Sequence, residues 1–286
     1  METSKWAIVN IETGEIINDV ASFRTRKQQV SYEKIKRFQN YKLMDSRRFV
    51  QCYHDPIKQV SSNLSLSECG AIMKLLVHVQ FNSGGLLQKD GEPLKQRDLE
   101  LILGRSKRQV ATIISSLEYA SIIKATKNGR SKLFYINEKF HMKGKRLKKI
   151  YFTKLLSKKL KEIAEELRLE ELGFLYKVLP YFHFQTCALA HNPNEEEEDR
   201  IKYMNRRELS TAVGYTEDNV TLLVKKLRNK GLVMSINSCG NVLYYIHPDL
   251  MFRQTNDGNS ERFNALRALF EAHKVNANNR THNSKG

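Results

Sequence analysis

The residues best suited to carry chemistry lie in one short run, 106–112, whose side chains can pair with the edges of nucleic-acid bases. Arginine and lysine donate to the two acceptors of guanine, glutamine pairs with adenine, and each good bidentate contact contributes roughly 1 to 3 kcal/mol of discrimination. The run supplies the candidate base-reading residues Ser106, Lys107, Arg108, Gln109 and Thr112. These residue types at this spacing predict contact with double-stranded DNA.

A helix must present this run, because side chains reach the base edges of a major groove from an element that fits inside it. Ser106 followed by Gln109 has the capping-box pattern of a helix start. Apolar residues then recur at the spacing that buries one helix face, and they are Val110, Ile113, Ile114 and Leu117. The opposite face, with Lys107, Arg108, Thr112 and Ser115, is expected to point outward.

The flanking segments predict how this helix is held. A first helix is expected within 69–81, a second opens near Pro93, and Gly104 falls at the sharp turn before the third. After the third helix, two extended runs flank the pair Asn128–Gly129, and Asn-Gly is the strongest short signal for a β-hairpin. Helix, helix, turn, helix and hairpin is the winged-helix arrangement.

The same pattern occurs twice in the sequence. The stretches 94–140 and 204–250 align without a gap, and the helices before them align with Gly70 opposite Gly173. The second copy differs by an acidic insertion at 192–200. A repeated pattern of this length predicts two copies of one structural module.

The expected fold is mostly α with small β wings, an α+β chain with two tandem winged-helix domains. The predicted parts are an N-terminal β-hairpin with a basic helical extension at 1–63, a first winged-helix domain at 64–140, a basic linker and helix at 141–166, a second winged-helix domain at 167–252, and a C-terminal amphipathic helix with a disordered tail at 253–286. The C-terminal helix has an apolar side that could dock on its own chain or on a second copy, formed by Phe263, Leu266, Leu269 and Phe270.

The charge of the chain indicates a polyanionic partner. Its 286 residues carry a formal net charge of +17, which attracts nucleic acid. The first hairpin offers candidate phosphate contacts at Lys124, Lys127, Asn128, Arg130 and Lys132. The following connection has no acidic residue from 139 to 161, and its candidate phosphate contacts are Lys143, Lys145, Arg146, Lys148 and Lys149. Beyond about 153 the lysines can instead form a solvated helix face, since Lys158 and Glu162 are spaced as an i,i+4 pair.

The third helix of the second copy begins differently, with Glu217 and Asp218. Carboxylates stabilise a helix N-terminus but repel phosphate, although Asp218 could accept from cytosine. The candidate DNA contacts in this copy are Asn219, Thr221 and Lys225. We expect the first copy to supply most of the affinity, while the second pairs with another subunit, as a homodimer or a DNA-dependent oligomer, or reads a weaker part of the site.

Enzymatic and metal-dependent classes are not favoured. The four cysteines are scattered without a C-x-x-C pair, and no phosphate-binding glycine-rich loop is present. His183, Cys187 and His191 would share a face of a helix but lack a fourth ligand, and the acids at 195–199 are adjacent residues of an insertion. We expect no enzyme, no cofactor and no metal site. Neither a signal peptide nor a membrane-spanning apolar run is found, so the expected location is the cytoplasm, in association with nucleoid or plasmid.

The second copy also resembles a known family. The segments "LEELGFLYKVLPYFHFQT", "NRRELSTAVGYTEDNVTLLVKKLRNKGLV" and "YYIHPDL" are similar to helix-turn-helix proteins of bacterial plasmids and phages, including replication initiators of the RepL kind. The resemblance covers about 64–252 and implies binding to repeated origin or operator sites and recruitment of other proteins, without an enzymatic step. Glu217 and Asp218 depart from that pattern, so the resemblance assigns them no DNA contact.

The predicted function is sequence-specific binding of double-stranded DNA, as a plasmid or phage replication initiator that acts with replication or transcription machinery. A winged-helix transcriptional repressor or activator would use the same contacts. An RNA-binding or scaffolding protein is the alternative from another class. No membrane partner is expected.

Overall fold

The computed structural model divides the chain into two compact units, one formed by 1–46 with 255–257 and one by the remaining residues. The described residues are 8–17, 25–33, 47–129, 131–144, 151–238, 241–254 and 258–283, with side chains in the last helix described up to Lys274. In the first unit, β1 (Ile8–Val9) and β2 (Ile16–Ile17) pair antiparallel where the sequence predicts a hairpin. A helix at 26–33 follows.

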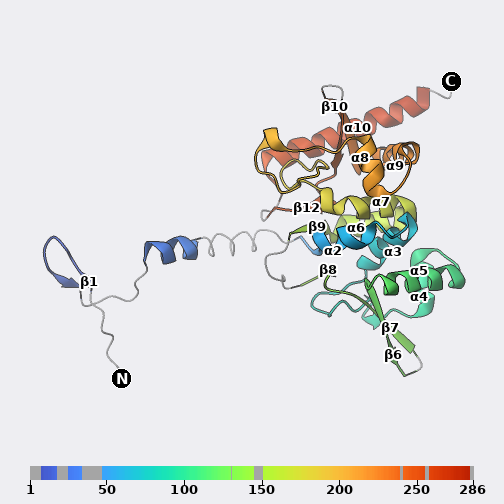
Figure 1. The fold of residues 1–286 in the computed structure, drawn as a ribbon, viewed down its shortest axis with the longest axis horizontal. Helices are drawn as coiled ribbons and strands as arrows, with labels where there is room; N and C mark the ends of the chain where they lie inside the picture. The colour runs from blue at the N-terminus through green and yellow to red at the C-terminus, as the bar shows by residue number, and fades with distance from the viewer. Residues whose placement is uncertain are drawn as a thin grey trace. The chain divides into compact units, whose positions relative to one another are not determined.

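The second unit contains one element order twice (Figure 1). The first repeat, 49–142, consists of β3 (Phe49–Tyr53), α2 (His54–Ser61), α3 (Leu66–Leu76), β4 (Gln88–Lys89), β5 (Glu92–Pro93), α4 (Gln96–Leu103), α5 (Lys107–Tyr119), β6 (Ile123–Asn128), β7 (Ser131–Ile136) and β8 (His141–Met142). The second repeat, 152–252, consists of β9 (Phe152–Leu156), α6 (Ser157–Glu166), α7 (Leu169–Val178), the 3-10 turns η1 (Leu179–Tyr181) and η2 (Glu198–Arg200), α8 (Arg206–Val213), α9 (Glu217–Asn229), β10 (Val233–Ser238), β11 (Asn241–Ile246) and β12 (Met251–Phe252). The helix α10 (Glu261–Asn283) follows.

Each repeat begins earlier than the sequence pattern indicates. A strand and a helix, β3 with α2 and β9 with α6, precede the expected first helix. Residues 152–166, expected to be part of a linker and a helix, therefore open the second repeat. The second helix of the first repeat also begins later than predicted, at Gln96, because Pro93 lies in β5 opposite Gln88.

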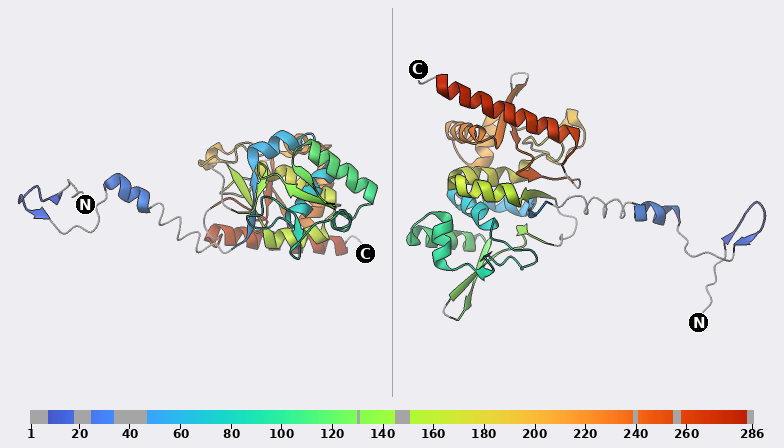
Figure 2. Two further views of the ribbon diagram at one scale, coloured as in Figure 1. Left: turned by 90° about the horizontal axis from the view of Figure 1, so that it is seen from below. Right: turned by 180° about the vertical axis from the view of Figure 1, so that it is seen from behind.

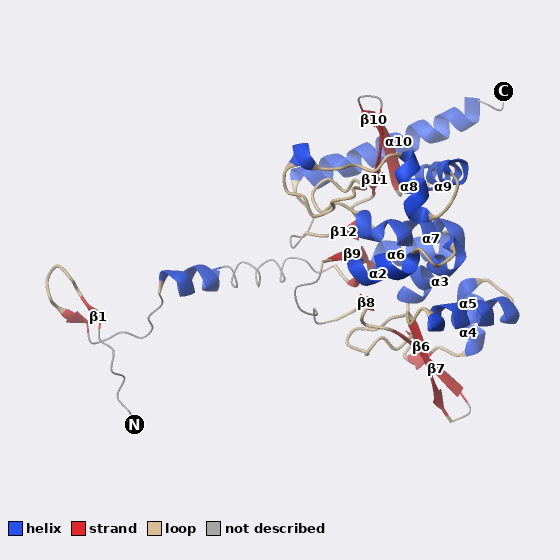
Figure 3. Ribbon diagram, in the orientation of Figure 1, coloured by secondary structure: helices blue, strands red, loops and turns tan. Residues whose placement is uncertain are grey.

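A four-stranded antiparallel sheet joins the two repeats, with the strand order β12-β9-β3-β8 (Figure 3). The central strands pair over their whole length, with Gln51 opposite Lys154 at the middle and Tyr53 opposite Phe152 at one end. The outer strands β8 and β12 occupy matching places on β3 and β9. This symmetric register means that an internal two-fold axis relates the repeats and passes through the middle of the sheet.

The helices α3 and α7 pack against each other on the same axis. A Cβ atom added to Gly70 would lie 1.9 Å from the carbonyl oxygen of Leu169, and one added to Gly173 would lie 1.9 Å from that of Leu66. These are equivalent positions in the two repeats. Only glycine permits two helix backbones to approach this closely. The two helices are therefore held together by backbone contact, with α4 and α5 at one end of the pair and α8 and α9 at the other (Figure 3).

The hydrophobic core is continuous across both repeats. The buried hydrogen bond between His141 of the first repeat and Tyr176 of the second joins their Nε2 and Oη atoms at 2.9 Å. Burial lowers the pKa of His141 to about 3, so this ring stays neutral in the fold. The repeats thus form one packed body with a polar contact inside it.

The C-terminal helix α10 packs on its own chain, against α9 and β10 (Figure 2, right, red). Phe263 and Phe270 are buried, and Leu266 is packed on the core, whereas Leu269 is 47% exposed. The predicted apolar side is therefore narrower than expected, because Leu269 faces away from the contact. Arg267 fixes the helix by donating from Nη2 and Nε to Asp249 at 2.7 and 3.0 Å.

Replacing Gly70 by Ala tests the backbone contact between α3 and α7. The added methyl group has no space against Leu169, so the helices must separate, and we expect the free energy of unfolding to fall by about 2 to 4 kcal/mol. Urea denaturation measures the change. Lys158→Ala, at an exposed position of α6, serves as the control and should change it by less than about 0.5 kcal/mol. Equal stability of Gly70→Ala and wild type would show that the contact does not hold the repeats together.

Candidate nucleic-acid interface

The turn between α4 and α5 depends on Gly104, the residue that ends α4. Its φ is +61°, in the left-handed region, and its amide donates to the carbonyl oxygen of Glu100. Gly214 ends α8 in the same way, with φ +73°. A Cβ on Gly104 would touch nothing within 4 Å, so glycine is needed there for its backbone conformation and not for space.

The start of α5 is fixed by the predicted capping box. The Ser106 hydroxyl accepts from the Gln109 amide at 3.4 Å, and the Gln109 side-chain oxygen accepts from the Ser106 amide at 3.2 Å. The four predicted apolar residues of this helix are buried: Val110, Ile113, Ile114 and Leu117. The cap and the buried face together set which side chains of α5 point to solvent.

Lys107 and Arg108 are exposed at the first turn of α5, as the sequence predicts. Neither side chain forms an ion pair with any residue that the structure describes. Thr112 is exposed one turn later, and its hydroxyl donates to the Arg108 carbonyl at 3.1 Å. The N-terminal end of α5 therefore presents two exposed cations without an ionic partner among the described residues.

Gln109 forms the predicted capping box, which limits the base contact that is also predicted for it. It is exposed, but its side-chain oxygen is occupied by the cap. Bidentate pairing with adenine needs both the oxygen and the nitrogen of the amide. Gln109 can contact a base with its amide nitrogen while the cap is kept, but bidentate pairing would require the cap to break.

The hairpin β6–β7 carries the second group of predicted contacts. Lys127 on β6 lies directly opposite Lys132 on β7, next to the pair of Asn128 and Ser131, and all four side chains are exposed. Like charges directly opposite each other destabilise a hairpin. A bound anion would relieve this repulsion, so the arrangement is suited to a phosphate group. Arg130 lies outside the described residues.

The predicted contacts after the first repeat are placed less favourably or lie outside the described part of the chain. The ammonium group of Lys143 donates to the carbonyl oxygen of Val79 at 3.0 Å, and burial lowers its pKa. Lys143 therefore points inward. It could contact a phosphate group only by breaking this hydrogen bond. The remaining four predicted residues, Lys145, Arg146, Lys148 and Lys149, are outside the described residues.

The first turn of α9 is acidic, in contrast to that of α5. The three exposed residues that follow the N-cap Thr216 are Glu217, Asp218 and Asn219. The Thr216 hydroxyl accepts a hydrogen bond from the Asn219 amide at 3.4 Å. Thr221 is exposed, and its hydroxyl donates to the Glu217 carbonyl at 2.8 Å. The end of α9 nearest a DNA duplex would thus carry two carboxylates.

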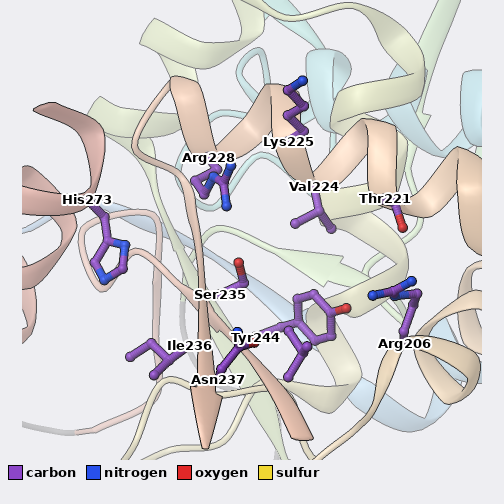
Figure 4. Close-up of a pocket in the computed structure, with 11 residues that line it drawn as sticks. Arg206, Thr221, Val224, Lys225, Arg228, Ser235, Ile236, Asn237, Tyr244 and His273 are labelled. Carbon is purple, nitrogen blue, oxygen red and sulfur yellow. The ribbon is translucent and has the colours of Figure 1, made fainter. Parts of the chain in front are cut away.

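Three cations of the second repeat lie elsewhere, around a pocket of about 530 Å³ between α9 and the hairpin β10–β11 (Figure 4). Arg206, Lys225, Arg228 and His273 line it, together with the polar residues Thr221, Ser235 and Asn237 and the apolar or aromatic residues Val224, Ile236, Val242 and Tyr244. Thr221 and Lys225 belong to the predicted DNA contacts, and Arg228 is expected at the far end of the same helix. The lining residues come from α8, α9, both strands of the hairpin and α10, so no single sequence pattern connects them.

The spacing of His183, Cys187 and His191 would allow three ligands on one helix face if the segment were helical. In the structure Cys187 has a φ of +60° and lies in a turn, so these residues do not share a helix face. His183 is instead bonded through Nε2 to the carbonyl oxygen of Glu195 at 2.8 Å. Among the described residues, no three His, Cys, Asp or Glu side chains are grouped as metal ligands.

Comparisons with known proteins give no match: no family model, no curated protein and no solved structure is significantly similar to the chain. Within the described residues, no helix combines the length and the apolar character needed to cross a bilayer. The chemistry of the exposed surfaces is therefore the basis for a functional proposal.

Replacing Lys132 by Glu tests the repulsion in the first hairpin. The opposite charges of Lys127 and Glu at 132 should raise the free energy of unfolding by about 0.2 to 1 kcal/mol at low salt. Thermal denaturation checks this. Lys124→Glu is the control, because Lys124 is exposed on the other strand of the hairpin, β6, and lies opposite the uncharged Tyr135. Equal effects of the two variants would mean that the Lys127–Lys132 pair is not under repulsion.

Proposed function

We propose that the chain is a sequence-specific double-stranded DNA-binding protein built from two tandem winged-helix modules. The observation that carries the proposal is the exposed start of α5, where Lys107 and Arg108 point to solvent without an ionic partner among the described residues. Behind them, the capping box and the buried face of the helix hold the first turn in place. Cations held in this way are pre-organised for guanine edges.

The geometry of the first repeat fits B-form DNA. A third helix enters the major groove with its N-terminal residues nearest the bases, and the hairpin lies along the backbone. In this docking, Lys107 and Arg108 meet base edges, while Lys127 and Lys132 meet phosphates. The deep, narrow major groove of A-form RNA does not admit a helix, so double-stranded RNA is the less suitable partner.

The internal two-fold axis suggests how the second repeat takes part. Helix-turn-helix dimers use their two-fold symmetry to place two recognition helices on two half-sites. Here α5 and α9 are related in the same way within one chain. One chain can therefore cover two half-sites, and these differ in sequence because α5 begins with Lys107 and Arg108 whereas α9 begins with Glu217 and Asp218.

Two biological settings fit this DNA binding: replication initiation and transcriptional regulation. Replication initiation at repeated origin sites is supported by the resemblance of about 64–252 to helix-turn-helix proteins of plasmids and phages, including replication initiators. Transcriptional regulation would use the same contacts and differ in what is bound next to the site. Association with replication or transcription proteins, and oligomers formed on DNA, belong to either setting.

Replacing Arg108 by Ala tests the base-reading role. Duplexes enriched from a random pool supply the target, and binding is measured for the target, for a random duplex and for structured RNA. We expect the preference for target over random duplex to fall by roughly 5- to 150-fold, the equivalent of one bidentate base contact.

Arg97→Ala is the matched control, since Arg97 is exposed on α4, outside the first turn of α5. It removes the same charge and should weaken both duplexes alike. If the two variants behave identically, Arg108 acts only through its charge. If wild type binds structured RNA as tightly as the target duplex, the proposal of DNA readout is wrong.

A further inference from the structure

The cationic pocket of the second repeat is not explained by base reading at the first turn of α9. Its cations lie further along the helix and on α8: Arg228 and Arg206 extend toward the space above the hairpin, whereas Lys225 lines the edge of the pocket with its ammonium group directed away from the hairpin (Figure 4). The first turn of α9 is acidic instead. The residues that can bind an anion and the residues that could read bases therefore lie at different places in this repeat.

The charges that line the pocket are of one sign. No carboxylate lines it, and Arg206, Lys225 and Arg228 form no ion pair with any residue in the described part of the chain. The Nε atom of Arg228 is buried without a hydrogen-bond partner in the structure. Like charges around one space repel each other, and a bound anion reduces that repulsion.

In the first repeat the helix positions of this pocket carry no cation, although the hairpin positions equivalent to Asn237 and Val242 are Lys127 and Lys132. The positions equivalent to Arg206, Lys225 and Arg228 are Gln96, Ser115 and Glu118. Conversely, the first hairpin has lysines at 124, 127 and 132, whereas neither β10 nor β11 contains a charged residue. The two repeats therefore place their phosphate-attracting charge differently, on the hairpin in the first and behind it in the second.

We propose that this pocket is a phosphate-binding seat, in which Arg206, Lys225 and Arg228 hold a phosphate group between α9 and the hairpin β10–β11. The inference rests on the proposed function, because the duplex backbone is the source of phosphate that this surface would meet. Arginine offers paired donors that match phosphate oxygens, and lysine adds a point charge. The hydroxyl of Ser235 and the amide of Asn237 line the same space and provide further donors.

His273 places α10 at the edge of this seat. The helix is held by the ion pair of Arg267 with Asp249 and by the buried ring of Phe270, which lies 4.8 Å from the ring of His247. The seat is thus built from four parts: α8, α9, the hairpin and α10. A seat assembled in this way fixes the direction from which a phosphate enters.

The test compares two neighbouring lysines of α9. Lys225 lines the pocket and Lys226 does not, while both are exposed and have the same charge. In the full chain, Lys225→Gln should weaken binding to target and random duplexes by the same factor. It should also lower the slope of log affinity against log salt by about 0.9, the value for one phosphate contact. Lys226→Gln should leave the slope unchanged.

A second arm identifies the source of the phosphate. Target duplexes with a single neutral methylphosphonate linkage are scanned with wild type and with Lys225→Gln. One linkage in the part of the site bound by the second repeat should weaken wild type but not the variant, because the variant has already lost that contact. If no linkage behaves in this way, but dATP raises the melting temperature of wild type and not of Lys225→Gln, the seat binds a free nucleotide.

The outcomes separate the two proposals. Equal effects of Lys225→Gln and Lys226→Gln would show that only overall charge matters and would overturn the seat. The seat is also wrong if Lys225→Gln binds DNA and dATP as wild type does while Arg108→Ala still loses discrimination, and the proposed function then stands without it. Failure of wild type to prefer any duplex removes the proposed function itself.

Discussion

The contact between α3 and α7 is the constraint on which the rest of the structure depends. Gly70 and Gly173 bring the two helix backbones together at equivalent points of the two repeats, and the strands β3 and β9 pair symmetrically about Gln51 and Lys154. Because each repeat is fixed to the other by backbone contacts, the positions of α5 and α9 are set by the fold of a single chain. A dimer of separate subunits would need an interface between two chains to achieve the same placement.

The two repeats share this framework but differ in surface chemistry. In the first, the exposed cations lie at the start of α5 and on the hairpin; in the second, carboxylates occupy the start of α9 and the cations line the pocket. The difference in surface chemistry also explains why α10 packs on the second repeat. Met234 and His247, which are buried in the second repeat, correspond to Lys124 and Asn137 in the first, so the surface beneath α10 is less polar than its counterpart in the first repeat.

The sequence predicts the local features well because their causes are local. The capping box of Ser106 and Gln109, the buried face of α5 and the left-handed turn at Gly104 each depend on residues a few positions apart. The strands β3 and β9 are missed because each has five residues and pairs with a distant partner. The inward orientation of Lys143 is not predicted for a related reason. The sequence gives its charge, but the hydrogen bond to the carbonyl oxygen of Val79 depends on a residue 64 positions away.

The central claim is that one chain presents two recognition helices to one duplex. Hydroxyl-radical footprinting of a complex whose mass shows a single bound chain tests it directly. The account predicts two separately protected stretches of backbone, one for each repeat, with the Gly70→Ala variant weakening the protection of both together. Protection of only one stretch by a single chain, with the second appearing only when another chain binds, would contradict it.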